Sequence, residues 1–341
     1  MASDQKGVVR RPLAAAASVT AAALKAADYK SDVQSDWCPG CGDFGILNAM
    51  AMALAEMQLP PWEVMLFSGV GCSSKTPHFV KTYGIHTLHG RVVPFALGAK
   101  LANPKMHVIA VGGDGDGYGI GAGHFVHAGR RNVDVAYIVF DNQVYGLTKG
   151  QASPTLGRGE KPKSLPQPNV NEGVNPIALA LSAGYTFVAR SYAFNLPHLK
   201  AMIRQAVEHR GMALVDVLQP CPTYNDLHTK DWFGQMVETP DGPKPRTYTL
   251  DSVGYDGRVR NPDDPEEVER QREGAFEMAH RKGERVPLGV FYQIELPTFE
   301  ERLAANIPIL KDATAASLAI EDPATHRPIT DLSHTYRELL V

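Results

Sequence analysis

The chain has 341 residues, of which 44% are hydrophobic and 21% charged, an ordinary balance for a globular protein with a full core. Its formal net charge of −3 argues against electrostatic binding of nucleic acid. The sequence shows no apolar run near the roughly 18 residues of a membrane span. It has four cysteines, too few for a disulfide-rich secreted scaffold, and no secretory signal. We therefore expect a cytoplasmic protein.

Segments of helical and strand character alternate along most of the chain. After an Arg- and Ala-rich stretch at residues 10–31, expected to form a short helical or extended arm, the first helix is predicted at residues 44–59. That segment is nearly all apolar and rich in helix formers. Further helices are predicted at residues 89–103, ending before Pro104, and at residues 122–132, 175–184, 196–211 and 264–283. Short apolar strands are predicted within residues 62–75, 105–121, 133–142, 212–221 and 286–293.

This alternation is typical of βαβ units, which build a parallel sheet covered by helices on both faces. We therefore predict the α/β class, with a doubly wound, mostly parallel sheet in residues 36–228. Residues 1–35 are predicted to form an N-terminal arm. Residues 229–341 are predicted to form a C-terminal extension that packs on this domain or on a partner subunit, irregular where Pro, Gly and Asp dominate. Asp264 and Pro265 then suit an N-cap and a first helical position.

The stretch GGDGDGYGIG at residues 112–121 follows a predicted buried strand. Glycines there let the backbone turn sharply and approach a ligand, with the next helix pointing its N-terminus at it, as in phosphate sites. One interpretation is a dinucleotide fingerprint, because Gly117, Gly119 and Ala122 fit G-x-G-x-x-A and Asp141 ends the next strand. Against it, the two acids of the stretch would lie beside a pyrophosphate of like charge. A nicotinamide- or flavin-binding dehydrogenase therefore stays an alternative.

The same acids favour a second interpretation, a diphosphate bound through a metal ion. Asp114 ends one predicted strand and Asn142 ends the next, so a βαβ crossover brings them together at the carboxyl edge of the sheet, where such sheets bind ligands. A carboxylate, an amide oxygen and the backbone carbonyl of Val144 suit Mg²⁺, with phosphate oxygens and water as the other ligands. The alternative is that Asp114 and Asn142 are turn residues, a role that suits both types.

The four cysteines include one C-x-x-C pair, Cys38 and Cys41, followed by Gly42. Such a pair serves in zinc sites, thiol–disulfide pairs, c-type haem attachment and iron–sulfur clusters. Haem attachment is excluded because a histidine would have to follow the pair. A thioredoxin-type pair is disfavoured, since no strand is predicted before Cys38. Zinc stays open beside iron–sulfur, although a four-cysteine zinc site normally shows two C-x-x-C pairs, whereas Cys72 and Cys221 are single.

Several motifs occur in a fixed order along residues 36–230: WCPGCG, SGVGCSSK, HTLHGR, GGDGDGYGIGAGHF, DNQVYGLTKGQASPT and LQPCPTYND. With this set the chain closely resembles the β subunit of 2-oxoacid:ferredoxin oxidoreductases, which have a thiamine diphosphate-binding fold. The resemblance implies a 4Fe–4S cluster held by Cys38, Cys41, Cys72 and Cys221. It implies thiamine diphosphate and Mg²⁺ held by Asp114, Asn142 and the Val144 carbonyl. Other residues expected at the cofactor are Gly115, Asp116, Gly146 and Leu147 along the diphosphate, and Gly71, Cys72, Ser73 and His89 elsewhere.

The resemblance also implies an activity: reversible oxidative decarboxylation of a 2-oxoacid to acyl-coenzyme A and CO₂, with electrons passing through the cluster to ferredoxin. It implies an α subunit that binds the aminopyrimidine of the cofactor, and a dimer of αβ heterodimers. The motifs HTLHGR and KGQASPT favour 2-oxoglutarate, as in 2-oxoglutarate synthases, with a pyruvate-specific member as the alternative. Lys75 and Lys149, on loops at the same sheet edge, are candidates for steering the substrate carboxylate. A zinc-stabilised interaction subunit is the alternative from another class.

Overall fold

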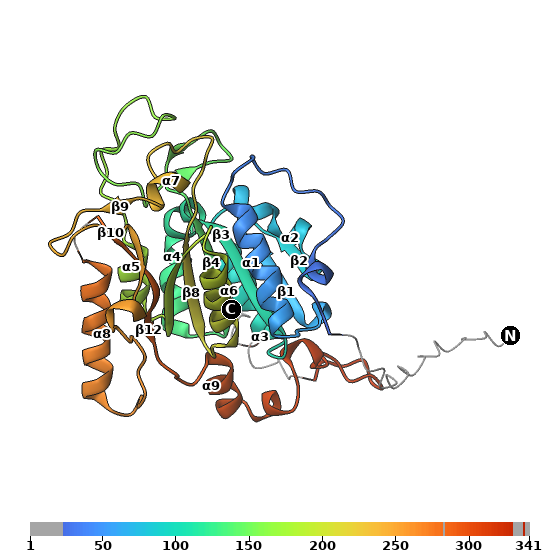
Figure 1. Ribbon diagram of the computed structural model, residues 1–341. Helices are drawn as coiled ribbons and strands as arrows, with labels where there is room; N and C mark the ends of the chain where they lie inside the picture. Colours follow the sequence, from blue (N-terminus) through green and yellow to red (C-terminus); the bar gives the residue numbers. More distant parts are fainter. Residues whose placement is uncertain (1–22, 282–283, 330–336, 338–341) are drawn as a thin grey trace.

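The computed structural model describes residues 23–281, 284–329 and 337 and is built around one eight-stranded sheet (Figure 1). In spatial order its strands are β11 (Thr247–Thr249), β12 (Val286–Gln293), β7 (Phe187–Tyr192), β8 (Met212–Leu218), β4 (Val135–Asp141), β3 (His107–Gly113), β1 (Val64–Ser68) and β2 (Tyr83–His86). Neighbouring strands of this sheet are parallel, apart from the antiparallel pair β7 and β12. The predicted α/β class and mostly parallel sheet are confirmed.

Helices cover both faces of the sheet, as Figure 1 shows. One face packs against α1 (Asp43–Glu56) and α6 (Leu196–Glu208), and the other against α3 (Val92–Ala102), α4 (Ala122–Arg131) and α5 (Pro176–Ala183). Each strand serves both cores because its side chains alternate between the faces: in β4, Ile138 lies in the first core and Val139 in the second. The sheet is therefore doubly wound, as predicted.

The other elements lie mainly in the connections. The remaining α-helices are α2 (Thr76–Phe79), α7 (Lys230–Phe233), α8 (Pro265–Ala279) and α9 (Phe299–Asn306). Two small antiparallel pairs join β5 (Val144–Tyr145) with β6 (Gln151–Ala152) and β9 (Met236–Val237) with β10 (Lys244–Pro245). Single turns of 3-10 helix lie at Ala26–Tyr29, Pro61–Glu63, Cys72–Lys75, Asp251–Val253, Pro308–Lys311 and Ala315–Ser317, and a π-helix spans Gly115–Ile120.

The predicted N-terminal arm is described only in part, because residues 1–22 lie outside the described residues. Its later part is anchored on α1. The Tyr29 side chain is fully buried, and its hydroxyl lies 3.0 Å from the carbonyl oxygen of Leu54 and 2.5 Å from that of Leu59. This aromatic anchor fixes where the chain enters the domain.

The predicted C-terminal extension adds strands to the main sheet. Its strand β12 pairs with β7 and with β11. Between residues 238 and 264 the described chain contains only β10, β11 and one 3-10 turn, in agreement with the irregular structure expected there. The domain boundary near residue 228 stays a prediction.

The start of α8 follows the expected capping pattern, and it yields a stability prediction. Asp264 accepts hydrogen bonds from the amides of Glu266 and Glu267, and Pro265 is the first helical residue. Replacing Asp264 with alanine is expected to lower the free energy of unfolding by about 1 kcal/mol, because two amides lose their acceptor. Urea unfolding of this variant beside an Asp263→Ala control measures the difference. Equal losses in both variants would contradict the capping role.

The outermost strand, β2, lies on the surface. All four of its residues are exposed, and Tyr83 and Ile85 are 56% and 38% exposed.

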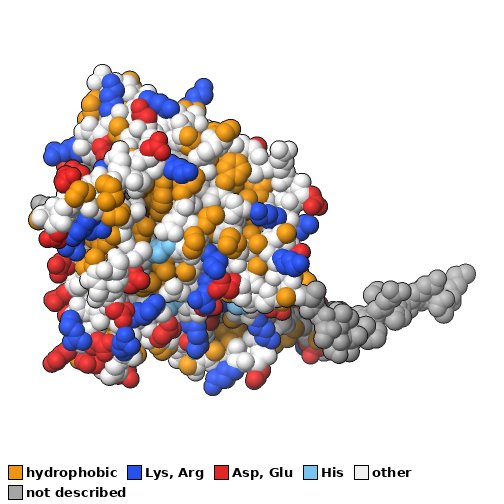
Figure 2. Space-filling model, viewed as in Figure 1, with side chains coloured by type: hydrophobic (Ala, Val, Ile, Leu, Met, Phe, Trp, Pro, Cys, Tyr) orange, Lys and Arg blue, Asp and Glu red, His pale blue; other side chains and the backbone are white. Residues whose placement is uncertain are grey.

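The face in Figure 2 carries charges of both signs, with Asp and Glu gathered along its left edge over α8. Within the described residues, the helices are too short or too polar to cross a membrane.

Candidate functional site

The predicted site residues meet at the carboxyl edge of the sheet, in two adjoining cavities. The first, which we name the edge cavity, is lined by every residue predicted to bind the cofactor or Mg²⁺: Gly71, Cys72, Ser73, His89, Asp114, Gly115, Asp116, Asn142, Val144, Gly146 and Leu147. The second, which we name the thiol cavity, has a volume of about 190 Å³ and is lined by all four cysteines. Both cavities are lined by Cys72, Asn142, Gly146 and Leu147, so they share a wall.

Asp114 follows β3 directly and is 1% exposed. Its Oδ2 atom accepts hydrogen bonds from the Gln143 amide at 3.1 Å, from the Thr155 hydroxyl at 2.5 Å and from the Ser153 hydroxyl. The Thr155 hydroxyl also lies 2.8 Å from Asp141 Oδ1. Burial raises the pKa of Asp114 and raises that of Asp141 well above its ordinary value. A buried carboxyl group that lines the edge cavity together with Asn142 and Val144 is a donor set that fits Mg²⁺.

Asn142 follows β4, the strand beside β3, and therefore reaches the same edge. Its side-chain oxygen accepts from the Val144 amide and its backbone carbonyl from the Asn225 side chain, both at 3.0 Å. The Val144 carbonyl accepts from the Gly146 amide at 3.0 Å. These bonds fold the turn that leads into β5. Since a carbonyl oxygen has two lone pairs, each oxygen can still bind a cation.

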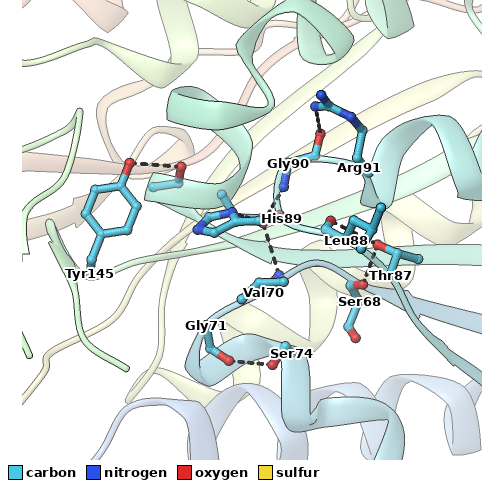
Figure 3. A network of polar contacts seen from close by, with 12 residues as sticks. Ser68, Val70, Gly71, Ser74, Thr87, Leu88, His89, Gly90, Arg91 and Tyr145 are labelled. Atoms are coloured by element: carbon cyan, nitrogen blue, oxygen red, sulfur yellow. Dashed lines mark hydrogen bonds and ion pairs between the residues drawn. The ribbon is translucent and has the colours of Figure 1, made fainter. Parts of the chain in front are cut away.

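Asp116 points toward two loops rather than along its own π-helix. Its Oδ1 atom accepts from the amides of Val70 at 3.0 Å and Gly90 at 2.8 Å, and lies 2.7 Å from His89 Nδ1. The His89 contact is electrostatic, because its alignment does not meet that of a hydrogen bond. Figure 3 shows Val70, His89 and Gly90 converging on this point. The side chain of Asp116 therefore holds two loops together at the edge cavity.

The four cysteines that line the thiol cavity differ in their exposure to solvent. Cys41 and Cys221 are buried, Cys72 is partly buried, and Cys38 is exposed. A Cβ atom on Gly146 would lie 3.5 Å from Cys72 Sγ and 3.8 Å from Cys221 Sγ, so both sulfurs approach the backbone of the β5–β6 turn. In the described part of the chain, no group of three or more His, Cys, Asp or Glu side chains is arranged to hold a single metal ion.

Burial and nearby backbone amides act on the pKa of the Cys221 thiol in opposite directions. The backbone amides of Thr223, Tyr224 and Asn225 lower this pKa and so oppose the rise caused by burial. The Asn225 amide donates to the Cys221 carbonyl oxygen at 3.0 Å. Burial also raises the pKa of Cys72, to about 12, with Asp43 and Cys221 adding to the rise. Such thiols are poor nucleophiles as they stand. A donor set of four thiols around one cavity, with backbone amides close by, fits an iron–sulfur cluster.

Asp43 is a site residue that the sequence analysis missed. It is the first residue of α1, is 0% exposed and lines the edge cavity. Burial raises its pKa to about 7, against the lowering effects of Cys41 and Lys75. A signal was available: an acid directly after C-x-x-C-G opens a helix that is otherwise almost wholly apolar.

The two candidate lysines lie outside the edge cavity. Lys75 forms an ion pair with Asp36, with Nζ and Oδ2 2.7 Å apart, and lines the thiol cavity. Lys149 is exposed and has a φ of 90°, which is costly for a residue with a side chain. Residues held at such angles are concentrated at functional sites, so Lys149 stays the stronger candidate.

Comparison with known families defines the class of protein first. Residues 65–217 match the family described as "Thiamine pyrophosphate enzyme, C-terminal TPP binding domain". Residues 221–306 match the family that describes the C-terminal part of the pyruvate ferredoxin oxidoreductase beta subunit. The first match spans the edge cavity residues from Val70 to Thr148. The chain therefore carries the domain that binds thiamine pyrophosphate (thiamine diphosphate).

Similarity to individual proteins identifies the family within this class. The chain is 54% identical over 301 residues to a 2-oxoacid:ferredoxin oxidoreductase subunit beta of Sulfolobus sp, covering 87% of this chain and 94% of the relative. It is 45% identical over 202 residues to the 2-oxoglutarate oxidoreductase subunit KorB of Mycobacterium tuberculosis, covering 59% and 54% of the two chains. The solved 2-oxoglutarate:ferredoxin oxidoreductase from Magnetococcus marinus superposes with a TM-score of 0.74 at 34% identity, covering 92% and 96%. The chain belongs to the β subunits of the 2-oxoacid:ferredoxin oxidoreductases.

Proposed function

We propose that this chain, together with an α subunit, converts 2-oxoglutarate, coenzyme A and oxidised ferredoxin reversibly to succinyl-coenzyme A, CO₂, a proton and two reduced ferredoxins. One observation carries the proposal: the residues expected to hold the organic cofactor and those expected to hold the cluster line two cavities with a common wall. The preference for 2-oxoglutarate is supported by the name of the Mycobacterium relative and by the Magnetococcus structure, which has 2-oxoglutarate, coenzyme A and succinyl-CoA bound.

Each bound group has its own protein partners in this proposal. Asp114, Asn142 and the Val144 carbonyl would hold Mg²⁺ at the diphosphate, with the backbone of the π-helix and of the β5–β6 turn alongside it. Cys38, Cys41, Cys72 and Cys221 would hold a 4Fe–4S cluster. Thiamine diphosphate supplies an ylid and an electron sink, and the cluster takes up single electrons. Because the cavities share a wall, electrons need not travel far between them.

The test uses the purified αβ complex. Iron, labile sulfide, Mg²⁺ and released thiamine diphosphate are quantified, and a panel of 2-oxoacids is assayed with ferredoxin and with a viologen acceptor. We expect both cofactors to be present and 2-oxoglutarate to give the highest kcat/KM. A pyruvate preference would leave the chemistry in place and correct the substrate. A colourless, zinc-containing complex would contradict the electron-transfer role.

The assembly forms a further part of the proposal. The described residues of this chain form one thiamine diphosphate-binding sheet, and an α subunit would supply the second surface for the cofactor, in a cytoplasmic dimer of αβ heterodimers. Light scattering on the reconstituted complex measures this stoichiometry. Full 2-oxoacid decarboxylation by the isolated chain would contradict the need for a partner.

Lys149 provides a prediction about the substrate. Replacing it with alanine keeps the strained backbone but removes the ammonium group, so the KM for the 2-oxoacid is expected to rise about tenfold, as for loss of one charge-assisted hydrogen bond. The expected change in kcat is smaller. Steady-state kinetics of the αβ complex, with the exposed Lys161→Ala as the control, measure this. An unchanged KM for the 2-oxoacid would assign Lys149 to another role.

A further inference from the structure

A cavity with three arginines in its wall, which we name the arginine cavity, lies at the amino edge of the sheet. Its volume is about 330 Å³, and it is lined by Arg130, Arg131, Phe299, Arg302, Leu303 and Asn306. These residues belong to α4, which ends shortly before β4 begins, and to α9. The edge cavity and the thiol cavity lie beyond the other end of the strands. Because β4 has 7 residues, the two edges are roughly 20 Å apart, and a ligand here would not touch thiamine diphosphate.

Buried hydrogen bonds hold the two helices in this arrangement. Asn132 is 4% exposed and is the left-handed C-cap residue of α4. Its carbonyl oxygen accepts from the Phe299 amide at 3.1 Å, and its side-chain amide donates to the Pro297 carbonyl at 3.3 Å. Its side-chain oxygen accepts from the Met212 amide at 2.9 Å. The end of α4 and the start of α9 are therefore fixed against each other, and the cavity between them is part of the fold.

The positive charge of the arginine cavity is not balanced by carboxylates of the described residues. None of them lines the cavity, and none forms an ion pair with Arg130, Arg131 or Arg302. Arg131 donates only to the His127 carbonyl of its own helix, at 3.4 Å. A guanidinium group stays protonated at every physiological pH, so the cavity gathers three positive charges whatever the conditions.

Helix dipoles explain only part of this charge. Arg130 and Arg131 lie in the last turn of α4, where a cation offsets the negative end of the helix dipole. Arg302 lies in the first half of α9, close to the positive end of that helix, where the dipole favours acids such as Glu300 and Glu301. The dipoles therefore give no reason for Arg302 to join the other two arginines, whereas a shared anionic ligand does.

We propose that the arginine cavity binds a nucleotide, with its phosphates at the arginines and its base against Phe299. Guanidinium groups bind phosphate oxygens through parallel N–H donors. Phe299 and Leu303 are half-buried and supply an apolar wall on which a flat base can stack. The cavity has the size of a small-molecule site, and the net charge of −3 disfavours a nucleic acid strand as the ligand. This inference is independent of the proposed activity, because the cofactor and the cluster would lie at the other edge.

The test titrates ADP into the αβ complex, with calorimetry as the measurement. The complex is first saturated with thiamine diphosphate and Mg²⁺, so that ADP cannot occupy the edge cavity. Arg302→Gln is expected to weaken ADP binding about tenfold, as for loss of one hydrogen-bonded ion pair, and Arg130→Gln with Arg302→Gln about 100-fold. Arg130→Gln, which changes α4 alone, is used if Arg302→Gln does not fold. Phe299→Leu is expected to weaken ADP binding about tenfold and to leave the affinity for inorganic phosphate unchanged.

The control is Arg210→Gln, which removes an exposed arginine that is already paired with Glu301 of α9 and lies outside the cavity lining. Since an exposed ion pair contributes little, this variant is expected to fold and to bind ADP as the wild type does. Equal weakening in Arg210→Gln and Arg302→Gln would show a general attraction of anions to a basic surface and would contradict the proposal.

Three other results would overturn the proposal. The first is a wild-type complex that binds no ADP at millimolar concentration. The second is wild-type affinity in the variant that lacks both Arg130 and Arg302, because ADP would then occupy another site. The third is binding of polyglutamate in preference to ADP, lost in that same variant, because the arginines would then serve an acidic protein partner.

Discussion

Replacing Cys221 with serine is expected to remove the visible thiolate–iron absorbance of the αβ complex and to abolish its reduction of ferredoxin. Cys221 is 7% exposed and lines the thiol cavity with the other three cysteines, and a hard hydroxyl oxygen is a poor substitute for a soft thiolate as a ligand of iron. Absorption spectra, iron and sulfide content and ferredoxin reduction are the measurements.

A neighbouring substitution is the control for this experiment. Thr223 lines the same cavity and is exposed, so Thr223→Ala is expected to keep its colour and iron content. A Cys221→Ser complex with a full complement of iron and unchanged spectra would show that this thiol is not a ligand. Zinc in place of iron in the wild-type complex would support the structural zinc alternative.

Replacing Asp114 with asparagine is expected to weaken binding of thiamine diphosphate with Mg²⁺ by more than about 100-fold, since even the outer hydrogen-bonding partners of metal ligands contribute 10–100-fold. Asparagine can keep a hydrogen-bonded oxygen toward Thr155 and Ser153 but lacks the charge that a hard cation needs. Calorimetry with Mg²⁺ present and absent measures the effect. The iron content is expected to stay at the wild-type level.

Ser153→Ala is the graded comparison for Asp114, because it removes one donor to the carboxylate and leaves the charge in place. This substitution is expected to weaken binding of thiamine diphosphate with Mg²⁺ about tenfold. If Asp114→Asn bound the cofactor with wild-type dependence on Mg²⁺, the cation would have to be held elsewhere on the edge.

The placement of Asp114 and Asn142 could be predicted because it follows from topology. Adjacent parallel strands end at one edge, and β3 and β4 are adjacent in the sheet. The four cysteines were grouped by resemblance alone, since nothing in their spacing brings Cys72 and Cys221 to the C-x-x-C pair. The fold does so by placing the turns after β1 and β8 beside the start of α1.

Three strands of the main sheet, β2, β7 and β11, were not predicted, and the first two escaped for different physical reasons. In β7, Arg190 interrupts the apolar run, but its guanidinium bonds Asp216 at 2.8 Å on the neighbouring strand, a pairing that local sequence does not show. In β2 all residues are exposed, so there is no apolar alternation to detect.

The π-helix at Gly115–Ile120 was expected to be a glycine turn. Glycine is a poor helix former, so tertiary packing, and not intrinsic propensity, determines the helical conformation of this segment. A Cβ on Gly115 would collide with the Tyr145 ring, and one on Gly117 with the Tyr137 hydroxyl. The glycines therefore serve close packing as well as ligand approach. Asp43 escaped notice for a similar reason, because its neighbours Cys72 and Cys221 are remote in sequence.

Strand β2 has a practical consequence for anyone who produces this chain by itself. One side of the strand bonds β1, while its outer row of amide and carbonyl groups marks the margin of the described sheet, beside the exposed Tyr83 and Ile85. Such a margin is a template onto which another copy can add a strand. Synthesis without a covering subunit is thus expected to yield aggregates, and joint expression from one transcript to yield dispersed material.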